Sequence, residues 1–363
     1  MDVRRSIAER RKPRGGSDGL ARLGFTLIEL LITMAIMAIL TAAMTYVMSG
    51  AQESAKIAKT RSLIARLNVL VMQKYESYRY RRLPVAIPAG LSPQDAAKVR
   101  CDVIRQLMRL EMPDRWTDVT DNPVRITNPA TGIKSIVMQR PTCNQAYLAF
   151  CNSVSSSTAF REHSLDYQGA KCLYLLATMG LEDADAAENF SEGDIADFDK
   201  TGCKVFLDAW GNPIEFLRWA PGFVSPLQPA KPGTSGVPAT ARDLRMPDQT
   251  DPTGVYGVRR NSSTSTSGKA DTFALYPLIY SAGADGNYDL VADGRNLNNG
   301  TAVFSYSKTN PPNDPFTSVS DTNHFPDGPI GASAVFPKPD IGRIPTRDLG
   351  NSDNIHNHTI GAR

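Results

Sequence analysis

The sequence predicts an α+β fold in which a long N-terminal helix packs on a C-terminal antiparallel β-sheet head, with a helical insertion between them. Three observations support this prediction. An apolar run from Phe25 to Met48 continues into a helical pattern that meets no proline before Pro84. Alternating apolar residues that flank a Gly-Asn-Pro turn indicate β-structure only from residue 204 onward. The sequence between these regions carries helix-start signals instead.

The apolar run at residues 25–48 is long enough to cross a membrane. As a helix rising about 1.5 Å per residue it extends roughly 36 Å, which exceeds the hydrocarbon core of a bilayer. Glu29 is its only charged residue, and an ionised carboxylate in hydrocarbon costs on the order of 2.5 to 3.5 kcal/mol. Glu29 therefore needs a partner, and cleavage after Gly24 would supply one as the new α-amino group of Phe25.

Residues 1–24 form a basic leader, with seven Lys and Arg residues against three acidic ones. The positive-inside rule keeps this leader in the cytoplasm and places residues from about 49 onward across the membrane. A secretory signal or a plain anchor also pairs basic residues with an apolar run. A secretory apolar region is shorter, however, at about 7 to 15 residues, and its small cleavage-site residues follow it, whereas Gly24 precedes this run. A plain anchor gains nothing from Glu29.

The segment Gly24-Phe25-Thr26-Leu27-Ile28-Glu29 after a basic leader resembles the prepilin cleavage and methylation signature of type IV pilins and type II secretion pseudopilins. The resemblance implies that a prepilin peptidase cuts after Gly24 and methylates Phe25, and that Glu29 sets the register of the subunit in a filament. It implies three kinds of partner: the peptidase, other pilin or pseudopilin subunits, and the inner-membrane platform of a secretion system. The implied location is the bacterial inner membrane, crossed once, with the leader cytoplasmic and the head in the periplasm or otherwise outside the cytoplasm.

The helical pattern continues through residues 49–83 as an amphipathic helix, which we expect to end near Arg82. Apolar residues recur every seven positions on one face, and basic residues take much of the other. The basic cluster 79–82 fits a helix C-terminus better than a nucleic-acid contact. Removing the leader, which carries a net charge of +4, lowers the formal charge from +3 to −1, so no nucleic-acid partner is expected. The recurring apolar residues are Ile57, Ile64, Val71 and Tyr78.

Residues 84–203 form the predicted helical insertion. Ser92, Pro93 and Asp95 are typical of a helix N-terminus, with Ser as the cap and Pro at the first position. This helix is expected to run to about Glu111. Beyond it the sequence predicts, in order, a turn-rich segment at 114–141, a mostly helical segment at 144–180, and an acidic run at 182–199 that fits a solvated loop better than a metal site.

The chain contains five cysteines, and none of them shows the Cys-x-x-Cys spacing of a zinc site. In an oxidising compartment some of them can form disulfides. Their odd number leaves at least one thiol within a monomer, and the spacing does not choose between the pairs. The five are Cys101, Cys143, Cys151, Cys172 and Cys203.

The β-sheet head is predicted at residues 204–295. A hairpin is expected at 204–219, and within it Asp208-Ala-Trp-Gly-Asn-Pro-Ile214 resembles the Asp-x-Trp-Gly-Asn-Pro segment of the major pseudopilin of type II secretion. We interpret that segment as structural, because Trp supplies buried area and Gly, Asn and Pro supply the turn. Residues 220–269 are rich in Pro, Gly, Ser and Thr and predict a long mobile loop, and an apolar strand follows at 272–280.

A third resemblance follows that strand. Ser281-Ala-Gly-Ala-Asp-Gly286 is similar to the loop that contributes to a calcium site in major pseudopilins. Calcium prefers hard oxygen ligands, and the acidic and amide residues here have the spacing of the first ligands of an EF-hand loop. Leu290 and Asn296 stand where an EF-hand needs Gly and Glu, so the loop is either a different calcium site or a plain turn. The candidate ligands are Asp285, Asn287, Asp289 and Asp293.

The remaining residues, 296–363, are rich in Asn, Pro and Asp and predict an irregular, exposed tail whose histidines lack a ligand spacing.

Two classes of function remain open. The first is a structural pilin-like subunit of an envelope filament, which is not an enzyme. The second is a periplasmic enzyme or binding domain tethered by the N-terminal helix. The sequence shows no nucleophile motif, phosphate loop or His-Glu-x-x-His pattern, which favours the structural subunit.

Overall fold

A computed structural model describes residues 26–123, 125–155, 167–180, 190–220, 276–288 and 353–360, together with Phe223, Leu227 and Leu290. The chain divides into two compact units, Met1–Glu53 and Ser54–Arg363, and we refer to the second as the head. Several sequence predictions fall outside the described residues. They concern the leader with Gly24 and Phe25, nearly all of the loop at 220–269, and the calcium candidates Asp289 and Asp293.

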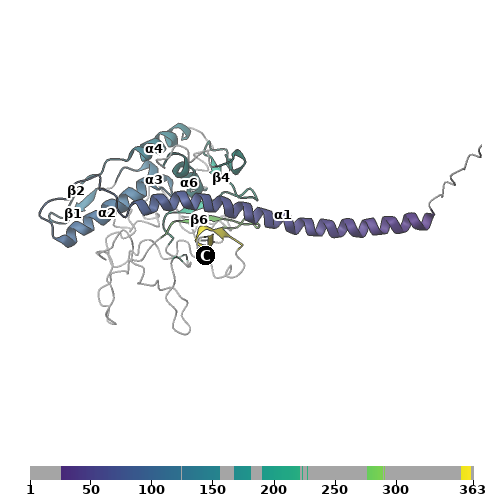
Figure 1. Ribbon diagram of the computed structural model, residues 1–363. Helices are drawn as coiled ribbons and strands as arrows, with labels where there is room; N and C mark the ends of the chain where they lie inside the picture. Colours follow the sequence, from purple (N-terminus) through teal and green to yellow (C-terminus); the bar gives the residue numbers. More distant parts are fainter. Residues whose placement is uncertain are drawn as a thin grey trace, which may run out of the picture. The chain divides into compact units, whose positions relative to one another are not determined.

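The structure has the predicted α+β composition, with one long N-terminal helix, α1 (Leu27–Ser77), of 51 residues (Figure 1). It ends slightly before the predicted Arg82, because the backbone from Tyr78 to Arg81 forms bonds between residues three apart instead of four. Within the head, α1 buries one face and exposes the other, which confirms the amphipathic pattern. The buried residues are Thr60, Leu63, Ile64, Leu67, Val71, Lys74 and Tyr75.

The second helix, α2 (Pro93–Glu111), confirms its predicted start and end. The Ser92 hydroxyl accepts a hydrogen bond from the backbone N–H of Asp95 at 3.1 Å, as an N-cap residue does. Met112 follows the last turn as the C-cap, and its N–H donates to the Met108 carbonyl at 2.8 Å.

The segment at 114–141 contains three short elements where the sequence predicted only turns. They are α3 (Trp116–Thr120) and an antiparallel pair of strands, β1 (Ile126–Asn128) and β2 (Ile133–Ile136). Elements of three to five residues are too short for a hydrophobic period to show in the sequence. The predicted helical segment that follows contains α4 (Thr142–Val154) and α6 (Gln168–Met179).

The predicted hairpin at 204–219 is only partly correct. Near its turn, the N–H of Asp208 donates to the Asn212 carbonyl at 2.9 Å, and a bridge joins Leu207 to Pro213. Beyond that point the two arms pair with different partners. β4 (Val205–Phe206) pairs with β3 (Ile195–Ala196), whereas β5 (Glu215–Leu217) joins a three-stranded antiparallel sheet ordered β5, β6 (Leu278–Ser281) and β7 (Ile355–His356).

The prediction of an irregular, exposed tail is wrong for residues 353–360. They form β7 and a short helix, α7 (Asn357–Ile360), and both Asn357 and His358 are buried. The Asn357 side chain accepts a hydrogen bond from the N–H of Ile279 at 3.0 Å and donates to Asn68 on α1 at 2.7 Å. Burial also lowers the pKa of His356 to about 4. Hydrogen bonds hold this polar segment in place, so the sequence has no apolar pattern that would predict it.

The acidic run at 182–199 was predicted as a solvated loop, and the part that the structure describes is instead tied to helices. Asp194 is almost fully buried and lies 2.8 Å from the Lys59 ammonium and 3.5 Å from the Arg66 guanidinium, both on α1. Burial opposes ionisation of Asp194, but hydrogen bonds from Lys59 and Ser191 and the nearby positive charges lower its pKa. These ion pairs help to fix the segment around Asp194 against the second half of α1.

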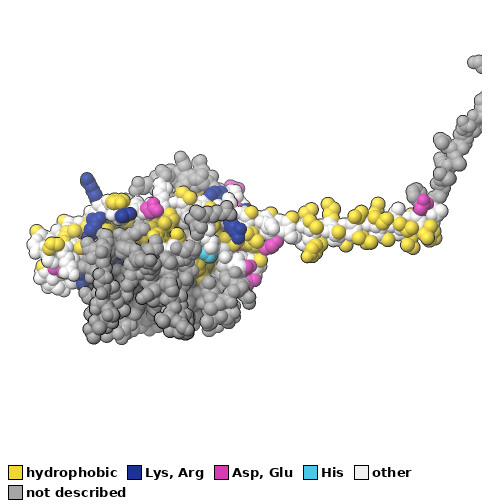
Figure 2. Space-filling view, turned by 60° about the horizontal axis from the view of Figure 1, so that its bottom comes forward, with side chains coloured by type: hydrophobic (Ala, Val, Ile, Leu, Met, Phe, Trp, Pro, Cys, Tyr) yellow, Lys and Arg dark blue, Asp and Glu magenta, His cyan; other side chains and the backbone are white. Residues whose placement is uncertain are grey.

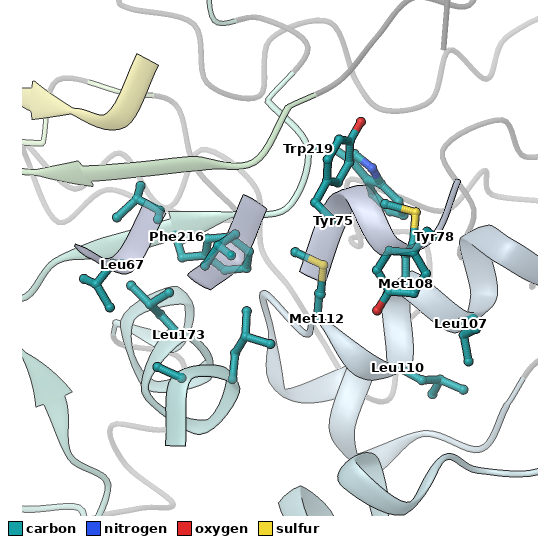
Figure 3. Close-up of a cluster of buried hydrophobic side chains, with 14 of the residues drawn as sticks. Leu67, Tyr75, Tyr78, Leu107, Met108, Leu110, Met112, Leu173, Phe216 and Trp219 are labelled. Carbon is teal, nitrogen blue, oxygen red and sulfur yellow. The ribbon is translucent and has the colours of Figure 1, made fainter. Parts of the chain in front are cut away.

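The main apolar core lies where α1, α2, α6 and the three-stranded sheet meet. Figure 3 shows Leu67 of α1, Leu173 of α6 and Phe216 of β5 grouped together. Next to them, Met108 and Met112 lie near Tyr78 and the indole of Trp219. The prediction that the amphipathic half of α1 packs on the sheet and helices that follow it is therefore confirmed.

An ion cluster lies beside this core. Asp118 of α3 accepts hydrogen bonds from Arg109 at 2.8 Å and from Arg218 at 2.7 Å, and each of these side chains is at most 3% exposed. Burial alone would raise the pKa of Asp118, but the guanidinium groups of Arg218, Arg109 and Arg115 outweigh it and hold that pKa well below its usual range. The cluster joins α2 and α3 to the strand that precedes Trp219.

Candidate functional site

The N-terminal end of α1 contains the first candidate site. Thr26 and Glu29 form a reciprocal set of hydrogen bonds. The Thr26 N–H and hydroxyl both donate to the Glu29 carboxylate, at 3.2 and 3.1 Å, and the Glu29 N–H donates to the Thr26 hydroxyl at 3.3 Å. This is a capping box, which satisfies backbone N–H groups at the start of a helix.

The capping box gives Glu29 a role within its own subunit, in addition to the predicted pairing with a neighbouring subunit. The sequence contains its signature, Thr-x-x-Glu at 26–29, although the prediction for Glu29 rested only on its charge. The carboxylate also lies in the first turn of α1, where the helix dipole favours negative charge. Gly24 and Phe25 lie outside the described residues, so the structure leaves their predicted roles untested.

From Leu30 to Met48, α1 exposes apolar side chains on all sides. Figure 2 shows hydrophobic side chains along the whole N-terminal part of α1. Its hydroxyl groups are satisfied within the helix, since Thr33 and Thr41 donate to the carbonyls of Leu30 and Met37 at 2.9 and 2.7 Å. Among the described residues, α1 is the one helix long and apolar enough to cross a membrane. Such a surface suits a lipid or helix-bundle environment.

Comparison with known families gives one match. Residues 21–45 match the prokaryotic N-terminal methylation motif. The chain therefore carries a prepilin-type motif of the type IV pilin and pseudopilin superfamily, which implies processing by a prepilin peptidase and the single-pass membrane anchoring typical of pilins. The comparisons with curated proteins and with solved structures give no match.

The methylation motif spans only 25 residues of the chain, so it does not reach the two segments that resemble the major pseudopilin. In the structure these two segments contact each other. The Ser281 hydroxyl donates to the buried Asp208 carboxylate at 2.7 Å, and the Asn212 amide donates to the Gly283 carbonyl at 3.1 Å. The Tyr288 hydroxyl donates to the Pro213 carbonyl at 2.6 Å. Together they form a polar junction at one end of the three-stranded sheet.

Asp208 organises this junction. One carboxylate oxygen accepts the backbone N–H groups of Trp210 at 2.9 Å and Asn212 at 2.8 Å, which fixes the Gly-Asn-Pro turn. The other oxygen accepts the Ser281 hydroxyl. The next residue, Ala209, donates its N–H to the Thr60 hydroxyl of α1 at 3.1 Å. The 208–214 segment is thus a structural connector between α1 and the sheet.

The described part of the calcium candidate loop is a compact turn. Asp285 accepts hydrogen bonds from the Asn287 N–H at 2.8 Å and from the Asn287 side-chain amide at 3.0 Å. Both residues are surface residues of the turn, and their oxygens are the ligand type that calcium prefers. Within the part of the chain that the structure describes, no group of three or more His, Cys, Asp and Glu residues has the arrangement of a metal site.

Sequence reasoning missed Asp353, which the structure brings to this loop from near the end of the chain. Its carboxylate accepts the Ala284 N–H at 2.7 Å. A Cβ at Gly283 would stand only 2.6 Å from that carboxyl group, and the φ of Gly283 is +73°, so this position requires glycine. Asp353 thus adds a carboxylate to the loop that contains Asp285. No local signal in the sequence connects residues this far apart.

Proposed function

We propose that this protein is a structural pilin-like subunit of a type IV pilus-like or type II secretion filament, with its head outside the cytoplasm. The observation that carries the proposal is the methylation motif at 21–45, which coincides with the apolar start of a 51-residue helix. A helix of this kind anchors the precursor in the membrane. The same apolar surface can bundle with the helices of other subunits.

The proposed assembly step uses Glu29. In the subunit alone, Thr26 supplies hydrogen bonds to the Glu29 carboxylate but no positive charge. The α-amino group that cleavage creates on Phe25 of a neighbouring subunit supplies that charge in an environment of low dielectric, where an ion pair is strong. Pairing of this kind sets the axial register between subunits.

The proposal predicts how the precursor is processed. We expect mass spectrometry of the membrane fraction to find a chain that begins with N-methylated Phe25. Gly24→Val should block this cleavage, because a branched side chain replaces the small residue at the cut. Gly19→Val makes the same change elsewhere in the leader and should leave processing intact. An intact leader in cells with an active prepilin peptidase, or equal processing of both variants, would contradict the proposal.

We also propose that the 281–293 loop binds calcium, with Asp285, Asn287, Asp289 and Asp293 as its ligands. The placement of Asp353 beside the turn supports this, because it adds a carboxylate to a loop already rich in oxygen donors.

The calcium proposal predicts a stability change in a soluble fragment that begins at Gly50. Millimolar calcium should raise its melting temperature by mass action, and magnesium should do so poorly. Combining Asp285→Ala with Asp289→Ala should abolish the shift. Glu192→Ala removes an exposed carboxylate elsewhere and should retain it. An unchanged melting curve for the folded, metal-free fragment would leave this loop as a turn only.

A further inference from the structure

Three of the five cysteines come together in the head from separate elements. Cys151 lies in the last turn of α4, Cys172 in α6, and Cys203 in the segment before β4. Burial is the main cause that raises the pKa of the Cys172 thiol, and the nearby Cys151 and Cys203 raise it further. Cys101 lies on α2, and Cys143 lies in the first turn of α4, eight residues before Cys151, where it is only partly buried against the apolar cluster around Tyr147.

Cys151 and Cys203 are nearly fully buried, at 3% and 1% exposed. Both belong to one buried apolar cluster, which also contains Trp116, Val119, Tyr147 and Leu175, and Cys172 is not a member of it. A second observation concerns Gly202, the residue before Cys203. A Cβ there would stand 3.2 Å from a methyl group of Val154, which follows Cys151 by three residues on α4. The backbone that carries Cys203 therefore lies directly against the last turn of α4.

The segment that carries Cys203 is held in this position. The Asp197 carboxylate accepts the N–H groups of Thr201 at 3.1 Å and Gly202 at 3.0 Å. Lys171, the residue before Cys172, forms an ion pair with Asp199. Gly202 has a φ of +84°, which suits glycine in this close turn. The two thiols thus face the same cluster in a fixed backbone.

We propose that Cys151 and Cys203 form an intramolecular disulfide in the mature protein. The inference rests on the proposed function, because it requires the head to lie in an oxidising compartment outside the cytoplasm. The bond would join the end of α4 to the start of β4, across a stretch of chain that includes α6. The spacing of the five cysteines does not by itself select this pair.

The chemistry is a thiol–disulfide exchange. One cysteine, as thiolate, attacks a disulfide donor such as a dithiol oxidase or oxidised glutathione and forms a mixed disulfide. The second cysteine displaces the donor thiol, so the S–S bond of the donor is reduced to two thiols as the new bond forms. Burial raises the pKa of Cys203 to about 11. The thiolate is therefore scarce once the cluster has packed, and the bond forms during folding.

The test is a peptide map of the full chain. Membranes are solubilised in denaturant with iodoacetamide, which caps every thiol, and the protein is digested without reductant. Trypsin alone leaves Cys143 and Cys151 together because no Lys or Arg lies between them, so chymotrypsin is added to cut after Phe150. We expect a linked pair of peptides, 151–160 with 201–204, that separates on reduction. Capped thiols are expected at Cys101, Cys143 and Cys172.

A matched set of variants separates this bond from other effects. Reductant should lower the melting temperature of the wild-type protein and of Cys101→Ser, but should leave that of Cys203→Ser unchanged. If Cys203→Ser does not fold, the peptide map of the wild-type protein still shows whether Cys151 and Cys203 are bonded. Two outcomes would overturn the pairing if they also occur after refolding with oxidised and reduced glutathione. The first is capped thiols at both Cys151 and Cys203, and the second is a bond from either of them to Cys172. Formation of the bond on refolding but not in cells instead contradicts the location of the head.

Discussion

Glu111→Ala is expected to lower the free energy of unfolding of the head by about 3 to 5 kcal/mol. Glu111 is the last residue of α2 and is 2% exposed. Its carboxylate accepts one hydrogen bond from the Tyr78 hydroxyl at 2.9 Å and two from the Arg81 guanidinium at 2.8 and 2.7 Å. The Lys74 ammonium lies 3.1 Å from it. One carboxylate therefore joins the end of α1 to the end of α2.

The expected loss is large because removing the carboxylate leaves its partners buried. The Lys74 side chain is only 9% exposed, so its charge cannot be hydrated without moving the helix end. The Tyr78 hydroxyl, which is buried, also loses its acceptor. Arg81 is more exposed and can turn toward water, which keeps the loss from being larger.

Urea unfolding of the soluble fragment from Gly50 measures this effect. Glu76→Ala is the control, because Glu76 is an exposed carboxylate on the same end of α1, and its change should stay within about 0.5 kcal/mol. Combining Lys74→Met with Glu111→Leu removes both opposite charges and should recover a large part of the stability. A loss of less than about 1 kcal/mol in Glu111→Ala would show that the contacts of the Glu111 carboxylate do not hold α1 to α2.

Glu29→Val is expected to lower incorporation of the subunit into filaments by about tenfold or more, with normal insertion in the membrane. A buried, hydrogen-bonded charge pair typically loses 2 kcal/mol or more when one partner is removed, and about 1.4 kcal/mol corresponds to a factor of ten. Insertion should not suffer, because valine is cheaper in lipid than a carboxylate. Crosslinked or sheared filaments and total membrane protein, both measured by immunoblot, give the ratio.

Two further variants separate the charge of Glu29 from its part in the capping box. Glu29→Gln can still accept the hydrogen bonds from Thr26 but carries no charge, so it should assemble as poorly as Glu29→Val. Thr26→Val removes the capping hydroxyl and keeps the charge, so its effect should be small, about 1 kcal/mol of helix stability. Normal incorporation of Glu29→Gln would show that the capping box, and not the charge pair, is what assembly needs.

The features that could be predicted from the sequence are those that depend on neighbouring residues. The apolar run and Glu29 are local patterns, and they coincide with the matched methylation motif. The α2 helix follows from Ser92 and Pro93 at its start, and the structure confirms it to Glu111. The face that α1 buries follows from a helical period over several turns. In each case the physical cause lies within a few residues of its effect.

Contacts between segments that are far apart in the sequence could be seen only in the tertiary structure. β7 is two residues long and exists because it pairs with β6, about 75 residues earlier in the chain. Asp353 reaches the candidate calcium loop by the same pairing, and Ser281 finds the Asp208 carboxylate across the sheet. Such contacts depend on loop closure and on hydrogen bonds between polar groups, neither of which leaves a periodic pattern in the sequence.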